Sequence, residues 1–248
     1  MLTGQIRTAF HDNRRVYGAP RIHAEFTDAG VHVGRKRIAR LMRQAGIVGC
    51  HRRKRSFSIT TQNLRAAPAP DLVDRKFVAT SPNQLWVADV TYVPTLEGWL
   101  YLACVTDVFS RLIVGWSMAS HRKSDLVVDA VTMAVVRRGG HVPGVIHHSD
   151  RGGEYTSHQL ERELRRHGAL ASMGSVADCF DNALAESVFA TLECELFDQQ
   201  PGGRFSTRRE AKLAVFDFLE TFYNPRRRHS ALGDEIPPGV RSFSPGEQ

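Results

Sequence analysis

The chain has 248 residues, of which 42% are hydrophobic, so it can form one ordinary core and a small additional unit. Its formal net charge is +7 and its pI is about 9.6, which favours a polyanionic partner. The four cysteines include no Cys-x-x-Cys pair, and the sequence has neither a signal peptide nor an apolar run long enough to span a membrane. We therefore expect a cytoplasmic protein with reduced thiols, no structural zinc site and no membrane partner.

The positive charge is concentrated at the N-terminus. Residues 1–65 contain 14 Lys and Arg against 3 Asp and Glu, whereas residues 66–248 contain 19 against 23. This distribution predicts a basic unit followed by a slightly acidic body.

Residues 1–49 predict a small, all-helical, basic unit. The first helix places Leu2, Ile6 and Phe10 on one face, the second begins near Pro20, and the third covers about 34–45. Two short helices with a basic second member resemble a helix-turn-helix. Residues 50–80, with prolines and little apolar periodicity, predict a basic linker, and residues 81–248 the catalytic body with a C-terminal helical extension.

The cations of the third helix and the linker are candidate DNA contacts. A basic helix or linker can follow a phosphate backbone. The alternative is a solvated helical face and a solubilising tether. The candidates are Arg35, Lys36, Arg37, Arg40, Arg43, Arg52, Arg53, Lys54 and Arg55.

From residue 83 onward the pattern alternates between strands and helices. Three strands in succession, then helix, strand, helix, strand and helix, predict an α/β fold with a mixed five-stranded sheet flanked by helices. The expected strands cover 85–93, 99–107, 111–118, 145–149 and 169–173. The expected helices cover about 125–138, 157–167 and 208–223, with capping boxes at Thr156/Gln159 and Thr207/Glu210, and a further helix opens within 179–186 and runs to about 196.

Three carboxylates occupy distinctive places in this pattern. Asp89 lies within an apolar strand, Asp150 ends a short buried strand, and Glu186 lies in the first turns of a helix, with 35 residues between the last two. The strand order places Asp89 beside Asp150, and the helix bearing Glu186 can close over them. Converging carboxylates repel one another unless divalent cations lie between them, so the pattern favours a metal site over three separate solvated acids.

Several blocks of sequence support a more specific reading. They are residues 17–22, 40–43, 46–49, 83–92, 147–152 with Tyr155, 181–187, and 223–224 with Arg227, His229 and Leu232. In this order and spacing they resemble the second-reading-frame (OrfB-type) product of bacterial insertion-sequence transposases, which share a retroviral-integrase-like core with the RNase H-like fold.

The resemblance implies a chemistry and a set of partners. It implies that Asp89, Asp150 and Glu186 bind two divalent ions, Mg²⁺ or Mn²⁺, as a DDE triad, and that the protein cleaves double-stranded DNA at the element's ends and joins it to a target. It implies a first-reading-frame product as a partner, a homo-oligomer on DNA, and association with the bacterial nucleoid. Oxygen-only ligands independently suit these metals better than zinc.

Two positions depart from the expected pattern. Glu154 stands where many relatives carry glutamine, and Glu193 where many DDE enzymes carry a cation facing DNA. We assign no ligand role to His147 or His148. We expect Trp86, Trp99 and Trp116 in the core, and residues 226–228 either at DNA or at a solvated helix end.

Two other functions fit part of this pattern. One is a metal-dependent nuclease of the same fold that hydrolyses DNA without joining it. The other is a non-catalytic DNA-binding regulator, which the intact acid triad argues against.

Overall fold

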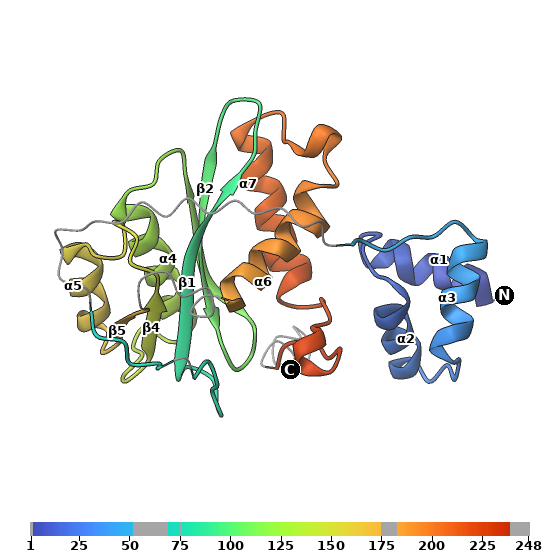
Figure 1. Ribbon diagram of the computed structural model, residues 1–248, viewed down its shortest axis with the longest axis horizontal. Coiled ribbons are helices and arrows are strands. Elements are labelled where there is room, and N and C mark those ends of the chain that lie inside the picture. Colours follow the sequence, from blue (N-terminus) through green and yellow to red (C-terminus); the bar gives the residue numbers. More distant parts are fainter. Residues whose placement is uncertain (1, 52–68, 75, 175–182, 239–248) are drawn as a thin grey trace, which may run out of the picture. The chain divides into compact units, whose positions relative to one another are not determined.

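The computed structural model describes residues 2–51, 69–74, 76–174 and 183–238 (Figure 1). The chain forms two compact units. One is Lys54–Phe216, and the other combines Met1–Arg53 with Asp217–Gln248. In the described part of the chain, no helix is long and apolar enough to cross a membrane.

The larger unit is built on a five-stranded sheet with the order β3-β2-β1-β4-β5. β1 pairs antiparallel with β2, and β2 with β3, whereas β4 pairs parallel with both β1 and β5. This mixed, RNase H-like arrangement confirms the fold class predicted from the sequence. The strands are β1 (Leu85–Val93), β2 (Leu100–Asp107), β3 (Ile113–Ala119), β4 (Ile146–Ser149) and β5 (Leu170–Met173).

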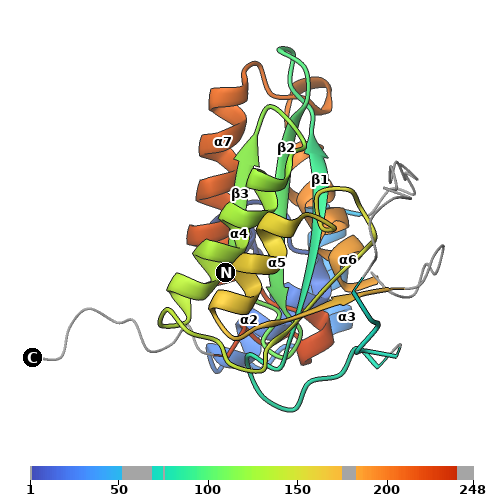
Figure 2. The ribbon, with the colours of Figure 1, turned by 90° about the vertical axis from the view of Figure 1, so that its left-hand side faces the viewer.

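Helices cover both faces of this sheet. α4 (Ser124–Arg137) and α5 (His158–Arg166) lie on one face, which is turned toward the viewer in Figure 2. α6 (Ala183–Leu192) and α7 (Arg208–Asp217) lie on the other (Figure 1). Gly115 allows α4 to approach β3 closely, because a Cβ there would lie 2.1 Å from the carbonyl oxygen of Ala130.

Two helices predicted as continuous change form near their C-terminal ends. α6 gives way to a π-helical turn at Glu193–Phe197, and α7 to another at Phe218–Tyr223. The wider turns carry i→i+5 hydrogen bonds, from Asp198 N–H to the Glu193 carbonyl and from Asn224 N–H to the Leu219 carbonyl. The first turn buries four consecutive residues, 194–197, which one face of a regular α-helix cannot do.

The predicted helix caps differ in outcome. Thr207 accepts a hydrogen bond from Glu210 N–H at 3.0 Å, as expected. The prediction for Thr156 was wrong: Ser157 is the N-cap of α5 and accepts from Leu160 N–H, while the Thr156 hydroxyl donates to the Gly153 carbonyl. A hydroxyl engaged in the preceding turn leaves the capping position to the next residue.

The smaller unit contains the three predicted N-terminal helices. They are α1 (Leu2–Asp12), α2 (Ala19–Asp28) and α3 (Arg35–Gln44). Their shared core is apolar and buried: Ile6, Ile22, Phe26, Ile38 and Met42. The sequence therefore predicted these three helices, and of the face expected for the first helix Ile6 is buried while Leu2 and Phe10 are half-buried.

Residues 217–238 belong to this smaller unit, although the sequence pattern assigned them to the catalytic body. The ring of Phe222 lies 6.0 Å from that of Tyr17, and the Arg14 guanidinium lies over Phe222 at 5.4 Å. Arg14 also pairs with Asp217 at 2.7 Å. Contacts between residues about 200 positions apart have no local sequence signal, so the pattern alone could not predict them.

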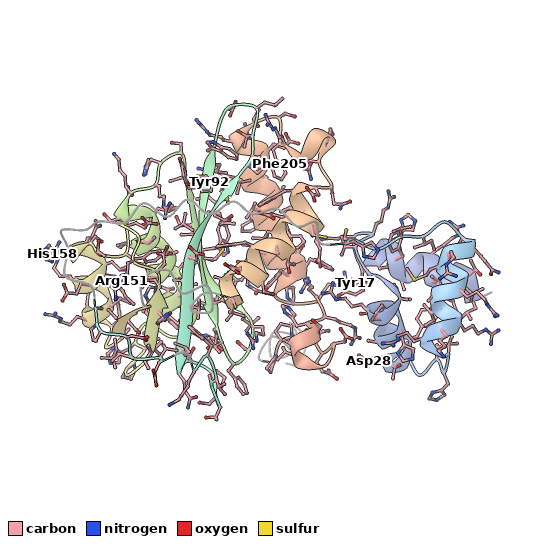
Figure 3. All side chains as sticks on the ribbon, in the orientation of Figure 1. Tyr17, Asp28, Tyr92, Arg151, His158 and Phe205 are labelled. Atoms are coloured by element: carbon pink, nitrogen blue, oxygen red, sulfur yellow. The ribbon has the colours of Figure 1, made fainter. Side chains whose placement is uncertain are left out.

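Arg228 forms the ion pairs between the C-terminal segment and the N-terminal helices. Its side chain is 4% exposed, its Nε lies 2.6 Å from Glu25 Oε1, and its Nη2 pairs with Asp28. Its backbone N–H donates to the Tyr17 hydroxyl at 2.8 Å. Tyr17 and Asp28, labelled in Figure 3, thus both belong to the surface that receives this arginine.

Candidate active site

Asp89 lies on β1, the central strand, just beyond the point where β1 stops pairing with the neighbouring strand β4. It pairs with Cys104 of β2, whereas the pairing of β1 with β4 ends one residue earlier, at Ala88 and Ser149. The Asp89 side chain is half-buried, and its Oδ1 accepts a hydrogen bond from Val90 N–H at 2.7 Å. Beyond Ala88, β1 therefore borders the segment that follows β4.

Asp150 is the first residue of that segment. Since Ala88 and Ser149 pair in parallel register, the two aspartates that follow them lie side by side. Gly152 N–H donates to Asp150 Oδ1 at 3.0 Å and orients the carboxylate. The sequence prediction that Asp89 and Asp150 become neighbours agrees with this register.

The electrostatics of the pair follow from burial and proximity. Burial, and then the charge of Asp150, raise the pKa of Asp89 to about 8. The thiol of Cys104, buried beside Asp89, has its pKa raised by burial and by that carboxylate. Negative charge at this site is therefore disfavoured in the metal-free protein, and a cation would relieve the penalty.

A further acid, Glu154, lies in the same segment as Asp150 and is buried. Glu154 is 7% exposed, and its Oε1 accepts from Arg122 Nε at 2.7 Å. Arg122 also hydrogen-bonds the Tyr92 phenol. The sequence analysis noted Glu154 but missed Arg122, because nothing in the sequence shows that Glu154 is buried and therefore requires a cationic partner.

Tyr155 brings a hydrogen-bond donor to this acidic cluster. It is 3% exposed, and its phenol oxygen has no hydrogen-bond partner in the part of the chain that is described. Burial, followed by the charges of Asp89, Asp150 and Glu154, holds the pKa of Tyr155 well above its usual range. The phenol therefore stays protonated and retains an O–H donor beside the two aspartates.

Arg151 connects the site segment to the far edge of the sheet. Its Nε donates to the carbonyl of Gly174 at 2.8 Å, just beyond β5. The residue is labelled in Figure 3. This bond gives the arginine that follows Asp150 a structural role.

Glu186 is an exposed residue in the first turn of α6, the helix that contacts β1. Within 2–51, 69–74, 76–174 and 183–238, no three His, Cys, Asp or Glu residues are grouped so that they could hold a metal ion. The structure thus brings Asp89 and Asp150 together and does not add Glu186 to them. Residues 175–182, which lead into α6, lie outside the described residues.

Comparison with known proteins agrees with this architecture. Residues 79–179 and 165–237 match two families described as Integrase core domain, and residues 2–55 match an HTH-like domain. The chain is 37% identical to the transposase for insertion sequence element IS904 of Lactococcus lactis subsp. lactis (strain IL1403), over 98% of this chain and 94% of that protein. The chain belongs to the insertion-sequence transposases.

Other relatives fall within the same family. Transposase InsF for insertion sequence IS3A of Escherichia coli (strain K12) is 37% identical over 94% of this chain and 79% of that protein. An insertion element IS600 protein of 31 kDa from Shigella sonnei is 39% identical over 96% of this chain and 85% of that protein. Among solved structures, the catalytic core domain of BIV integrase is 17% identical, with a TM-score of 0.45 over 62% of this chain and 91% of that chain.

Five of the nine candidate DNA contacts of this transposase lie within the described residues, and all five are on α3. The five cations of α3 are all exposed: Arg35, Lys36, Arg37, Arg40 and Arg43. Arg52, Arg53, Lys54 and Arg55 fall outside the described residues. In the second basic run, residues 226–228, Arg226 is exposed, whereas Arg227 and Arg228 are buried. Arg227 and Arg228 therefore lie neither on a DNA-contacting surface nor at a solvated helix end, which were the two expectations for this run.

The two histidines on β4 are core residues. His147 and His148 are both buried; His148 hydrogen-bonds Ser172 at 2.9 Å, and burial lowers the pKa of His147 to about 4.

The three tryptophans differ in burial. Trp86 is a core residue, as predicted, and Trp116 is half-buried. The prediction for Trp99 was wrong: it is 53% exposed, because it lies at the β1–β2 turn, where only one side of the ring is packed, against Tyr92.

Proposed function

We propose that this transposase catalyses metal-dependent DNA cleavage and strand transfer at the ends of an insertion sequence. The observation that carries the proposal is the adjacent pair Asp89 and Asp150, in which burial and mutual repulsion raise the pKa of Asp89 to about 8. Such a pair is costly as architecture and suited to a divalent cation. Membership of the insertion-sequence transposases supports DNA as the substrate.

The donor set fits magnesium or manganese. The oxygens of Asp89 and Asp150 are hard ligands, which suit these ions better than zinc. Ions held there by the two aspartates would supply activation of the attacking oxygen and stabilisation of the leaving oxygen of the phosphodiester. Glu186 would provide the third carboxylate from α6, which already lies against β1.

The other residues of the site would orient the carboxylates and donate hydrogen bonds to the substrate. Gly152 N–H orients Asp150, and the buried O–H of Tyr155 is available to a phosphate or water oxygen beside the pair. The exposed cations of α3 would hold the phosphate backbone of double-stranded DNA. Joining two ends to a target calls for at least a dimer on DNA, and a first-reading-frame product would contribute recognition of the ends.

A gel assay on a labelled duplex that carries the element's own ends tests the proposal. Wild type with Mg²⁺ or Mn²⁺ should give both cleaved and joined products. Asp89→Asn, Asp150→Asn and Glu186→Gln should each lose both by at least about a hundredfold, because each change removes a metal-neutralising charge at nearly constant volume. Glu161→Gln, on the exposed face of α5, is the matched control and should behave as wild type.

The same gel separates the alternatives. Cleavage without joined product would identify a nuclease that only hydrolyses. DNA binding without either product at any metal concentration would identify a non-catalytic regulator. Wild-type activity in Glu186→Gln would remove that residue from the site and leave a two-aspartate centre.

A further inference from the structure

We propose that Arg122 and Glu154 form a positioning pair that holds the segment 150–155 against β1 and so sets the placement of Asp150 in the strand-transfer reaction. The inference rests on the proposed function. It assigns a role to two residues that do not themselves contact the reacting atoms.

The pair connects three separate parts of the sheet. Arg122 follows β3, Glu154 follows β4, and Tyr92, which hydrogen-bonds the same guanidinium, belongs to β1. Nε and Nη2 of Arg122 both lie within reach of Glu154 Oε1, at 2.7 and 2.5 Å. Since β4 stops pairing with β1 at Ser149, this bridge supplies the lateral contact that the strands no longer provide.

The burial of the pair separates it from an ordinary surface ion pair. The side chains of Arg122 and Glu154 are 17% and 5% exposed, whereas those of Arg165 and Glu161, at a similar distance of 2.6 Å, are 78% and 52% exposed. Removing one partner of a buried pair leaves an uncompensated charge, whereas an exposed pair is screened by water. The loop should therefore rearrange when either buried partner is removed.

Gly152 transmits that rearrangement to Asp150. A Cβ on Gly152 would lie 2.9 Å from Glu154 Oε1 and 3.0 Å from Asp150 Oδ1, so both carboxylates are packed against this one residue. Gly152 N–H also donates to Asp150, and its carbonyl accepts from Tyr155 N–H at 3.0 Å. Displacement of Glu154 therefore moves the group that orients Asp150, and Tyr155 with it.

Charge balance gives a reason for an acid at position 154. The Arg122 guanidinium lies close enough to Asp89 to favour its ionised form. A cation next to a metal-binding carboxylate competes with the metal unless it is neutralised, and Glu154 neutralises it. A neutral glutamine at 154 would leave Arg122 beside the site with its charge uncompensated.

The test is a double-mutant cycle of Arg122→Met and Glu154→Gln in the full chain, with two readouts. The first is the rate of DNA joining at saturating Mg²⁺. The second is the affinity for Mn²⁺ without DNA, measured by electron paramagnetic resonance. Arg165→Met with Glu161→Gln provides the matched exposed pair, and circular dichroism and thermal unfolding verify that each variant is folded.

Each single variant should join DNA about tenfold or more slowly than wild type, as a small misplacement of a reacting group predicts. Glu154→Gln, which also leaves the charge of Arg122 uncompensated, should bind Mn²⁺ about tenfold more weakly. The double variant should be no worse than the poorer single variant, because the two residues act as one unit. Arg122→Lys, which keeps the charge, should recover part of the loss. The exposed pair should change neither readout.

Wild-type joining and Mn²⁺ affinity in both folded single variants would overturn the inference, as would losses that multiply in the double variant. If Arg122→Met does not fold, Arg122→Lys and Glu154→Gln decide in its place. A wild-type chain that joins no DNA refutes the proposed function, and the Mn²⁺ affinities then decide the positioning role alone.

Discussion

At the scale of single residues, the pKa of Asp89 depends on its surroundings in the fold as well as on its place in the sequence. The sequence placed an acid within an apolar strand and predicted its neighbour Asp150 from the order of elements. The raised pKa of Asp89 depends first on its burial, which only the structure supplies, and then on the charge of Asp150. An isolated acid in the same sequence context, open to water, would titrate normally.

The pKa of Asp89 predicts a pH dependence of stability in chelator. The folded chain holds a proton up to about pH 8, whereas the unfolded chain releases it near the ordinary value of 3.8. The stabilisation from this proton is complete below the unfolded pKa and is lost as pH rises toward 8. The unfolding free energy of wild type, relative to Asp89→Asn, should therefore fall between pH 5 and 8 and level off above that.

Urea unfolding of both proteins in EDTA at several pH values measures this difference. A difference that stays constant across the range would show that Asp89 is ionised throughout. The same protonation predicts that Mn²⁺ affinity rises with pH by up to about tenfold per unit until pH 8, since the metal must displace one proton.

At the scale of elements, local patterns predicted most strands and helices, and long-range contacts determined the rest. β1 and β4 follow from short apolar runs, and α3 from 3.6-residue periodicity, in their own residues. The two π-helical turns and the attachment of 217–238 to the N-terminal helices do not, because partners far away in sequence select them. Arg122 was missed for the same reason: its partners, Tyr92 and Glu154, lie about 30 residues away on either side.

The ion pairs of Arg228 predict that the C-terminal segment stabilises the helical unit. Arg228→Met should lower unfolding stability by on the order of 2 kcal/mol, less than for a fully buried pair because Asp28 is half exposed. DNA affinity should fall with it, since α2 loses the partner of Glu25 and Asp28. Arg226→Met, two residues earlier and exposed, is the matched control.

Thermal unfolding and DNA binding by fluorescence anisotropy give the two measurements. If Arg226→Met weakened DNA binding and Arg228→Met did not, the basic run would contact DNA directly, and the ion pairs would have no bearing on the helical unit.

At the scale of the whole molecule, the uneven distribution of charge predicts that the N-terminal unit binds DNA. The excess of Lys and Arg lies in residues 1–65, and the five cations of α3 are exposed. Deleting this segment would also remove the partners of Arg228 and Phe222, so loss of binding after deletion would have two causes. Substitution on α3 avoids that ambiguity.

Replacing the five exposed cations of α3 with glutamine should weaken DNA binding and flatten its salt dependence. For each phosphate that the variant no longer neutralises, the slope of log K against log salt should decrease by about 0.9, because fewer counterions are released on binding. Anisotropy titrations at several salt concentrations measure the slope. An unchanged slope would mean that the basic face of α3 is only solvated.

The central claim is that Asp89, Asp150 and Glu186 hold catalytic metal ions together. Anomalous diffraction from crystals of the full chain soaked in manganese tests it most directly. We predict manganese peaks within roughly 2 Å of carboxylate oxygens from all three residues, with α6 placed so that Glu186 reaches the two aspartates. Manganese bound elsewhere, or bound to Asp89 and Asp150 with Glu186 still directed into solvent, would contradict the claim.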